Sequence, residues 1–317
     1  MNLQRPELPP PHVDPAVPRD RGWPAAAKAT GAAGMDHGAL LPVLAEVPLV
    51  TTEDEFVFAW LLADEADAIS LDLYRDAELL VVTKPDRTEV SEADRAVEDR
   101  LRHLIRKQRP EQGVHGPQRG AQGSRRVRWL LDPIDATSNF VRGVDWWATL
   151  LAVEIDGRVE VAMISAPAMG RRWWATRGQG AWTTGPLDPS PRPLAVSRVD
   201  DLADAHLAYG DLRLDSWFVG LAARCWLARG IGDFLMFCLL AEGAVDVVVG
   251  HHGDRLWDLA APGLVVTEAG GALTDPAGQP WAEGQLAIAS NRLLHEAVLA
   301  AIPPSAVLPA PVGDRGS

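Results

Sequence analysis

The chain has 317 residues, of which 47% are apolar, and its formal net charge is −13. This length and apolar content suffice for one large packed domain or two modest ones, while the acidic balance argues against a nucleic-acid partner or an anionic membrane surface. An anionic substrate remains compatible, because a bound cation inverts the local field. The only two cysteines, Cys225 and Cys238, lie within one apolar stretch and predict buried thiols in a reducing, cytoplasmic compartment.

The two ends of the chain differ in composition from the middle. Residues 1–44 combine a triple proline with an Ala/Gly-rich stretch and lack the basic-then-apolar pattern of a signal peptide, so they predict a disordered extension. Residues 304–317 predict a flexible tail. No stretch of 18 consecutive apolar residues is present, which predicts no membrane span. Residues 45–303 are therefore the predicted folded domain.

The first predicted elements are two helices. Apolar residues at helical spacing predict a helix that begins after Thr51 or Thr52 and ends near Tyr74. Ser91, followed three residues later by Asp94, resembles a capping pair, and it predicts a charged amphipathic helix that runs to about Lys107.

Strands dominate the middle of the chain. An apolar run over 127–131 predicts a buried strand, and the runs 147–155 and 159–164 flank Asp156-Gly157, a strong hairpin signal. Further short strands are predicted over 171–175, 180–182 and 194–196.

Helices and strands alternate in the second half. The predicted strands are 205–209, 245–249 and 287–289, and the predicted helices are 215–228, 234–242, 257–269 and 293–301. The whole pattern predicts an α/β fold in which helices and sheets form an αβαβα layered sandwich.

The most informative motif is the segment 132–140, which reads DPIDATSNF. Asp132 and Asp135 leave the end of an apolar strand just before a predicted helix, so both carboxylates can point at one cation, with the Ile134 carbonyl between them. Such oxygen ligands suit Mg²⁺, and the N–H groups of Ala136 and Thr137 at a helix start suit phosphate. For an isolated Asp-Pro pair, a turn with Asp135 as helix cap is the better interpretation.

Three further segments give this motif a context. Residues 84–94 read KPDRTEVSEAD, residues 115–120 read HGPQRG, and residues 257–271 read WDLAAPGLVVTEAGG. In this order they resemble the inositol monophosphatase family, and the resemblance covers about residues 45–300. It implies the layered sandwich fold that this family shares with the fructose-bisphosphatases. Residues 171–182 (RRWWATRGQGAW) and 229–234 (RGIGDF) look like the actinobacterial histidinol-phosphatase branch. The tryptophans are equally compatible with simple packing.

The resemblance implies roles for particular residues. Asp132, Asp135, Asp258 and the Ile134 carbonyl match metal ligands, with Asp132 bridging ions, and Asp94 and Thr137 match the pair that orients the attacking water. The implied phosphate- and substrate-binding residues are Lys84, Ala136, Thr137, His251 and His252. The resemblance also implies Mg²⁺, a small-molecule phosphate substrate and a homodimer.

The chain departs from the family pattern in its metal loop. The first glutamate of the family's G-E-E loop aligns with Pro117 and the second with Gln118, so fewer ions than the family norm are expected. Glu111 is the nearest acid, and it can compensate only if the loop is rebuilt. His115 and Arg119 belong to a substrate pocket only if their loop lies near the metal.

Two departures lie outside that loop. The position seven residues before Asp258, where an acid that binds a substrate hydroxyl or amine is common, holds His251, beside His252. Both are either exposed loop histidines or part of a pocket for a second anionic or acceptor group. Ala136 replaces a glycine, which is tolerable if its φ stays negative.

Three functions are compatible with these residues. The first is a Mg²⁺-dependent phosphomonoesterase acting on histidinol phosphate, a sugar or cyclitol phosphate, or a nucleotide-like phosphate. The second is a diverged member that binds, regulates or catalyses another biosynthetic reaction, which the loss at Pro117 favours. The third is a structural protein, which clustered carboxylates disfavour because like charges are costly without a cation.

Overall fold

The computed structural model describes residues 51–76, 78–83, 89–210, 216–251 and 254–303. The chain divides into two compact units, Met1–Pro48 and Leu49–Ser317, and every described helix and strand lies in the second. The predicted extension over 1–44 and the predicted tail over 304–317 fall outside the described residues. None of the described helices is long and apolar enough to cross a membrane.

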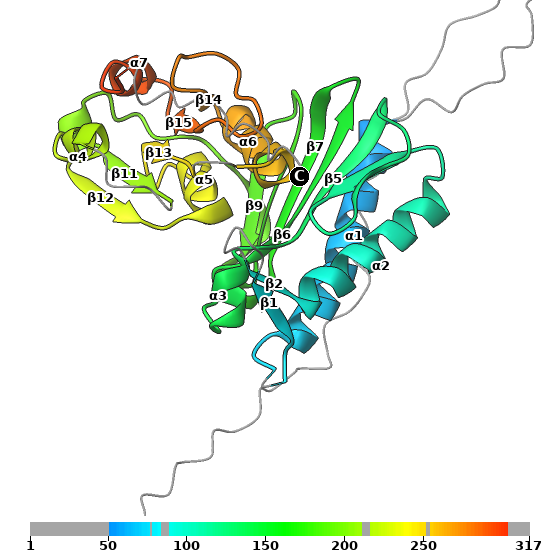
Figure 1. Cartoon of the computed structure of the whole chain (residues 1–317). Coiled ribbons are helices and arrows are strands. Elements are labelled where there is room, and N and C mark those ends of the chain that lie inside the picture. The colour runs from blue at the N-terminus through cyan, green and yellow to red at the C-terminus, as the bar shows by residue number, and fades with distance from the viewer. Residues whose placement is uncertain (1–50, 77, 84–88, 211–215, 252–253, 304–317) are drawn as a thin grey trace, which may run out of the picture. The chain divides into compact units, whose positions relative to one another are not determined.

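An eight-stranded sheet forms the centre of this unit (Figure 1). Adjacent strands within this sheet are antiparallel, except that β3 and β5 run parallel to each other. Asp156 and Gly157 have φ of 49° and 82° between β6 and β7, so the predicted hairpin is confirmed. In spatial order the strands are β10 (Asp188–Pro193), β9 (Ala181–Gly185), β8 (Arg171–Thr176), β7 (Arg158–Ala166), β6 (Ala148–Ile155), β5 (Val127–Asp135), β3 (Gly113–Gly116) and β4 (Gly120–Gln122).

Two long helices cover one face of this sheet (Figure 1). α1 (Thr52–Leu73) is capped by the Thr51 side chain, and α2 (Glu92–Gln108) begins with a complete capping box between Ser91 and Asp94. Both helices therefore begin where their caps predict. Their buried faces share one hydrophobic cluster with the sheet, which includes Leu62, Leu101, Trp129 and Trp147. A two-stranded ribbon of β1 (Val81–Thr83) and β2 (Glu89–Ser91) precedes α2.

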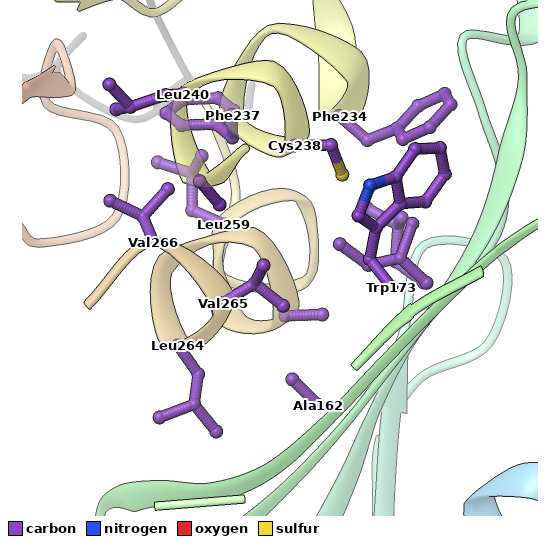
Figure 2. Packing of buried hydrophobic residues seen from close by; sticks show 14 of the residues in the cluster. Ala162, Trp173, Phe234, Phe237, Cys238, Leu240, Leu259, Leu264, Val265 and Val266 are labelled. Carbon is purple, nitrogen blue, oxygen red and sulfur yellow. The ribbon is translucent and has the colours of Figure 1, made fainter. Parts of the chain in front are cut away.

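Two apolar helices cover the opposite face. α5 (Asp233–Ala241) and α6 (Leu256–Glu268) share a second hydrophobic cluster with the sheet. Figure 2 shows Phe234 and Cys238 of α5 beside Trp173 of β8, with Val265 of α6 below them; the rings of Phe234 and Trp173 lie 6.0 Å apart. Cys238 is buried as predicted, and Cys225 is a partly buried free thiol.

A five-stranded sheet packs on the far side of α5. Its order is β12 (Leu227–Gly230), β11 (His206–Tyr209), β13 (Val247–Val249), β15 (Ile288–Ser290) and β14 (Ala272–Thr274). α4 (Ser216–Ala222) and α7 (His295–Leu299) join a third hydrophobic cluster with it. The second cluster lies on both sides of α5 and α6, since it includes residues of both sheets, and the first and third clusters fill the outer interfaces. The five layers confirm the predicted αβαβα sandwich. Short 3₁₀ turns, η1 (Pro167–Met169) and η2 (Leu202–Asp204), link strands.

Two element predictions were wrong. Residues 194–196 are not a strand: the sheet edge is formed by the proline-rich β10, and the Val196 N–H leaves the sheet to donate to the Ala269 carbonyl at the end of α6. Prolines are tolerated there because an edge strand has no partner on one side. The predicted helix 215–228 ends at Ala222, and β12 then pairs in parallel with β11. Pairing with a strand from elsewhere in the chain overrides the local helical pattern.

Candidate metal and phosphate site

Asp132 and Asp135 point to the same side of the sheet because the end of β5 is irregular. In a regular strand, residues three apart face opposite sides. Here the register with β6 shifts between Asp132 and Asp135, at Pro133, which has no N–H to give to a neighbouring strand. The Pro133 carbonyl instead accepts the Thr149 hydroxyl at 2.8 Å. The bulge redirects the second carboxylate, as bulges beside functional sites commonly do.

Asp258 reaches the same place from α6. It is the third residue of that helix, and its carboxylate accepts the Arg255 N–H at 2.7 Å in a capping box. Asp132, Asp135 and Asp258 each offer an oxygen within 4.8 Å of the other two. The predicted convergence of these carboxylates across more than 120 residues of sequence is therefore present in the fold.

Some surroundings of the cluster disfavour ionised carboxylates and others favour them. Burial, followed by repulsion from neighbouring carboxylates, raises the pKa of Asp132 and Asp135 well above the usual range, and burial raises the pKa of Asp258 to about 6. Against this, Asp135 accepts the Phe234 N–H at 2.8 Å at the start of α5, and α6 also begins at the cluster. Two positive helix ends partly compensate the charge. A divalent cation would compensate two of the three negative charges.

The predicted water-orienting pair is assembled beside the cluster. The Thr137 hydroxyl lies 2.9 Å from the Ile134 carbonyl and 3.3 Å from the Asp94 carboxylate. Asp94 is buried and holds the start of α2, where it accepts the Ser91 N–H at 2.8 Å and the Ser91 hydroxyl at 2.7 Å. Burial raises the pKa of Asp94. Asp94, the third residue of α2, is thereby fixed next to Thr137.

Ala136 does not meet the condition of a negative φ under which alanine in place of glycine would be unstrained. Its φ and ψ are 64° and 47°, the left-handed region, where it caps α3 (Thr137–Val141). The backbone at this position keeps the conformation that favours glycine, and the Cβ of alanine there costs about 1 kcal/mol of stability. Because α3 starts here, the N–H groups of Ala136 and Thr137 have no acceptor within the helix.

The turn that replaces the G-E-E loop joins β3 to β4. Pro117 and Gln118 are both partly buried, and the Gln118 and Arg119 N–H groups donate to the Glu98 carboxylate of α2 at 2.8 and 3.0 Å. The loop does not bring Glu111 to the cluster, because Glu111 is exposed at the far end of β3. The expectation for Arg119 was wrong, because its guanidinium pairs with Asp99 on the exposed side of α2.

His115 does face this region. Its ring stands nearly perpendicular to that of Trp257, the neighbour of Asp258, with 5.0 Å between ring centres. Its Nδ1 is buried without a hydrogen-bond partner among the described residues, and burial lowers its pKa.

His251 follows β13 (Val247–Val249) in the chain. Its Nε2 accepts the Asp233 N–H at 3.1 Å, and its own N–H donates to Asp254 at 3.2 Å. The ring lies against Gly210, where a Cβ would overlap it. His251 is therefore a fixed side chain rather than a free loop histidine. Lys84 and His252, the other predicted substrate contacts, lie outside the described residues.

Sequence reasoning missed two acids close to the cluster. Asp254 is buried, and burial together with the charge of Asp258 raises its pKa well above the usual range. Asp233 begins α5 with φ of 51°, and its charge raises the pKa of Asp135. A signal for Asp254 was available, since it precedes Asp258 by four residues at a helix start.

Comparisons with known proteins give the family and the fold of the chain. Residues 53–305 match the model of the inositol monophosphatase family. The chain is 43% identical to histidinol-phosphatase of Streptomyces coelicolor over 78% of its length and 96% of that protein. It is also 43% identical to histidinol-phosphatase of Mycobacterium tuberculosis, over 78% and 97%. Among solved structures, the extragenic suppressor protein SuhB of Bartonella henselae superimposes with a TM-score of 0.72 at 26% identity, covering 78% of this chain and 98% of that one. The chain therefore belongs to the inositol monophosphatase family.

Proposed function

We propose that the protein is a Mg²⁺-dependent phosphatase that hydrolyses a small phosphorylated metabolite. The observation that carries the proposal is the convergence of Asp132, Asp135 and Asp258, from β5 and α6, within 4.8 Å. Buried carboxylates with raised pKa values fit a hard divalent cation, and the Ile134 carbonyl is a further oxygen donor beside them. Family membership supports the same class of reaction.

The residues of the chain then have separate tasks. Asp132, Asp135 and Asp258 would hold a divalent cation, which would supply a Lewis acid and favour deprotonation of the attacking water. Thr137 and Asp94 orient that water, with Asp94 held by the Ser91 cap. The N–H groups of Ala136 and Thr137 face the phosphate oxygens. Lys84, His251 and His252 contact the rest of the substrate.

The substrate class is narrowed by the relatives. Histidinol phosphate is the leading candidate, because the two relatives at 43% identity are histidinol-phosphatases. Sugar, cyclitol and nucleotide-like phosphates are alternatives, since His251 stands where an acid is common in the family. We further propose a cytoplasmic homodimer, which light scattering on the purified protein tests directly.

A second candidate function rests on Pro117. Without the loop glutamate, the ion count falls below the family norm, and the pocket can serve binding, regulation or another reaction. Because the remaining ligands converge, we favour a phosphatase with fewer ions.

One experiment separates the two candidates. Phosphate release is measured over a panel of phosphomonoesters with Mg²⁺ and with a chelator. Release that requires Mg²⁺ and disappears in Asp258→Asn supports the phosphatase. Cation binding by calorimetry without release of phosphate from any member of the panel supports the second candidate.

A further inference from the structure

A buried ion pair on α2 forms hydrogen bonds with the turn at residues 116–120, where the family's glutamate is replaced by Pro117. The Glu98 and Arg102 side chains are 0% and 3% exposed and lie 2.8 Å apart. Glu98 accepts the N–H groups of Gln118 and Arg119, while Arg102 donates to the Gly120 carbonyl at 2.5 Å and the Val114 carbonyl at 3.5 Å. One helix thus binds both donors and acceptors of the β3–β4 hairpin.

These hydrogen bonds require the Glu98 side chain to approach the backbone of the turn closely. A Cβ at Gly116 would lie 3.1 Å from the Glu98 carboxylate and 3.1 Å from the Leu131 carbonyl, so the glycine lets the helix side chain and β5 meet the turn. Charged groups removed from water are costly unless every partner is in place. Here both Glu98 and Arg102 have hydrogen-bond partners in the hairpin besides each other, so the pair fixes the position of the turn.

The register shows where the turn lies. β3 runs parallel to β5 with His115 opposite Leu130 and ends one residue later, at Gly116. A Cβ at Gly116 would come within 3.1 Å of the Leu131 carbonyl, and Asp132 is the next residue of β5. Pro117 therefore begins the turn beside the part of β5 that carries the carboxylate cluster, although it offers no ligand itself.

We propose that Glu98, with Arg102, is a positioning residue of the metal site: it holds the 116–120 turn so that the side chain at position 117 faces the cluster. This inference rests on the proposed function. It implies that the second cation position is still formed by the backbone and lacks only its acid, and that restoring the acid works only while Glu98 is present.

The test counts Mn²⁺ ions per chain by electron paramagnetic resonance titration, independently of activity. We expect one tightly bound ion in the wild type and two in Pro117→Glu. Adding Glu98→Gln to Pro117→Glu should weaken the second ion roughly 10–100-fold, the usual effect of losing an outer partner of a ligand, and leave the first ion in place. Glu98→Asp, which keeps the charge but is one methylene shorter, should give the same loss.

Glu55→Gln is the matched control. Glu55 is also buried and pairs at 2.9 Å with Arg109, the residue that follows α2. Among the described residues its carboxylate accepts from Arg109 and Gln112 and from no residue of the turn. Combined with Pro117→Glu it should keep both ions, and melting temperatures show that all variants are folded.

Three results would contradict the inference in different ways. A second ion bound equally well with and without Glu98 overturns the positioning role. No second ion in Pro117→Glu shows that position 117 is not aimed at the cluster. A wild type that binds no ion contradicts the proposed function itself, and the positioning role falls with it.

Discussion

Pro133 controls where two acidic side chains of the candidate site point. Because it has no N–H, β5 cannot continue its ladder there, and the register shift that follows turns Asp135 toward Asp132. The Thr149 hydroxyl satisfies the freed Pro133 carbonyl. A residue without any functional group of its own thus sets the geometry of the candidate ligands.

Asp132→Asn should abolish Mg²⁺-dependent phosphate release, by at least about a hundredfold, because a ligand is lost. The metal-free variant should melt at the same or a higher temperature than the wild type, since repulsion by Asp135 and Asp258 helps to raise the pKa of Asp132. Phosphate assays and calorimetry check both effects. Unchanged release by this variant would place the chemistry elsewhere.

Ala136→Gly should stabilise the protein by about 1 kcal/mol, because glycine has no Cβ to strain a φ of 64°. Urea denaturation measures the free energy of unfolding. Ala121→Gly is the control: it lies on the exposed edge strand β4 and should lose stability. A loss in both variants would contradict strain at Ala136.

At the scale of elements, the β3–β4 turn has Pro117 where the family has a glutamate, while the contacts of Glu98 and Arg102 with the turn are present. Pro117→Glu should raise Mg²⁺-dependent phosphatase activity, because a positioned base contributes roughly 10²–10⁴-fold. Ala121→Glu adds the same charge to an exposed position of the same hairpin and should leave the activity unchanged. Equal rates in the wild type and Pro117→Glu would show that another group has this role.

Element predictions succeeded where the signal is local. The caps at Thr51 and Ser91 and the Asp156-Gly157 hairpin depend on neighbouring residues only, and each lies where expected. β12 and β14 were missed because each has three or four residues and exists through pairing with distant strands. Short strands carry too few residues for a reliable period.

At the scale of the whole molecule, the cluster links stability to pH. Burial raises the pKa of Asp258 from 3.8 to about 6, so between these values the folded chain holds a proton that the unfolded chain has lost. The free energy of unfolding of the metal-free protein should therefore fall as pH rises from about 4 to 6, by roughly 1–3 kcal/mol.

Denaturation at several pH values, with Mg²⁺ and with a chelator, checks this slope. Saturating Mg²⁺ should restore stability above pH 6, because binding requires the deprotonated ligands. Asp258→Asn should show a smaller slope. A metal-free wild type whose stability rises across this range would contradict the assignment.

Removal of residues 1–44 should leave the melting temperature and phosphatase activity unchanged. All three hydrophobic clusters are built from residues of the unit Leu49–Ser317. Calorimetry of the shortened chain beside the full chain measures the effect, and a large fall in melting temperature would show that the extension is part of the fold.

The sequence by itself determined the family, the layered α/β class, most helices and the acids that form the cluster, because these depend on local spacing and on motifs with specific chemistry. Only the tertiary structure decided that Asp258 meets Asp132 and Asp135, that Ala136 is left-handed, that Arg119 turns away to Asp99, and that Glu98 holds the turn at Pro117. These features arise from packing between elements distant in the chain, where burial and hydrogen-bond geometry, not local propensity, set each side chain's direction.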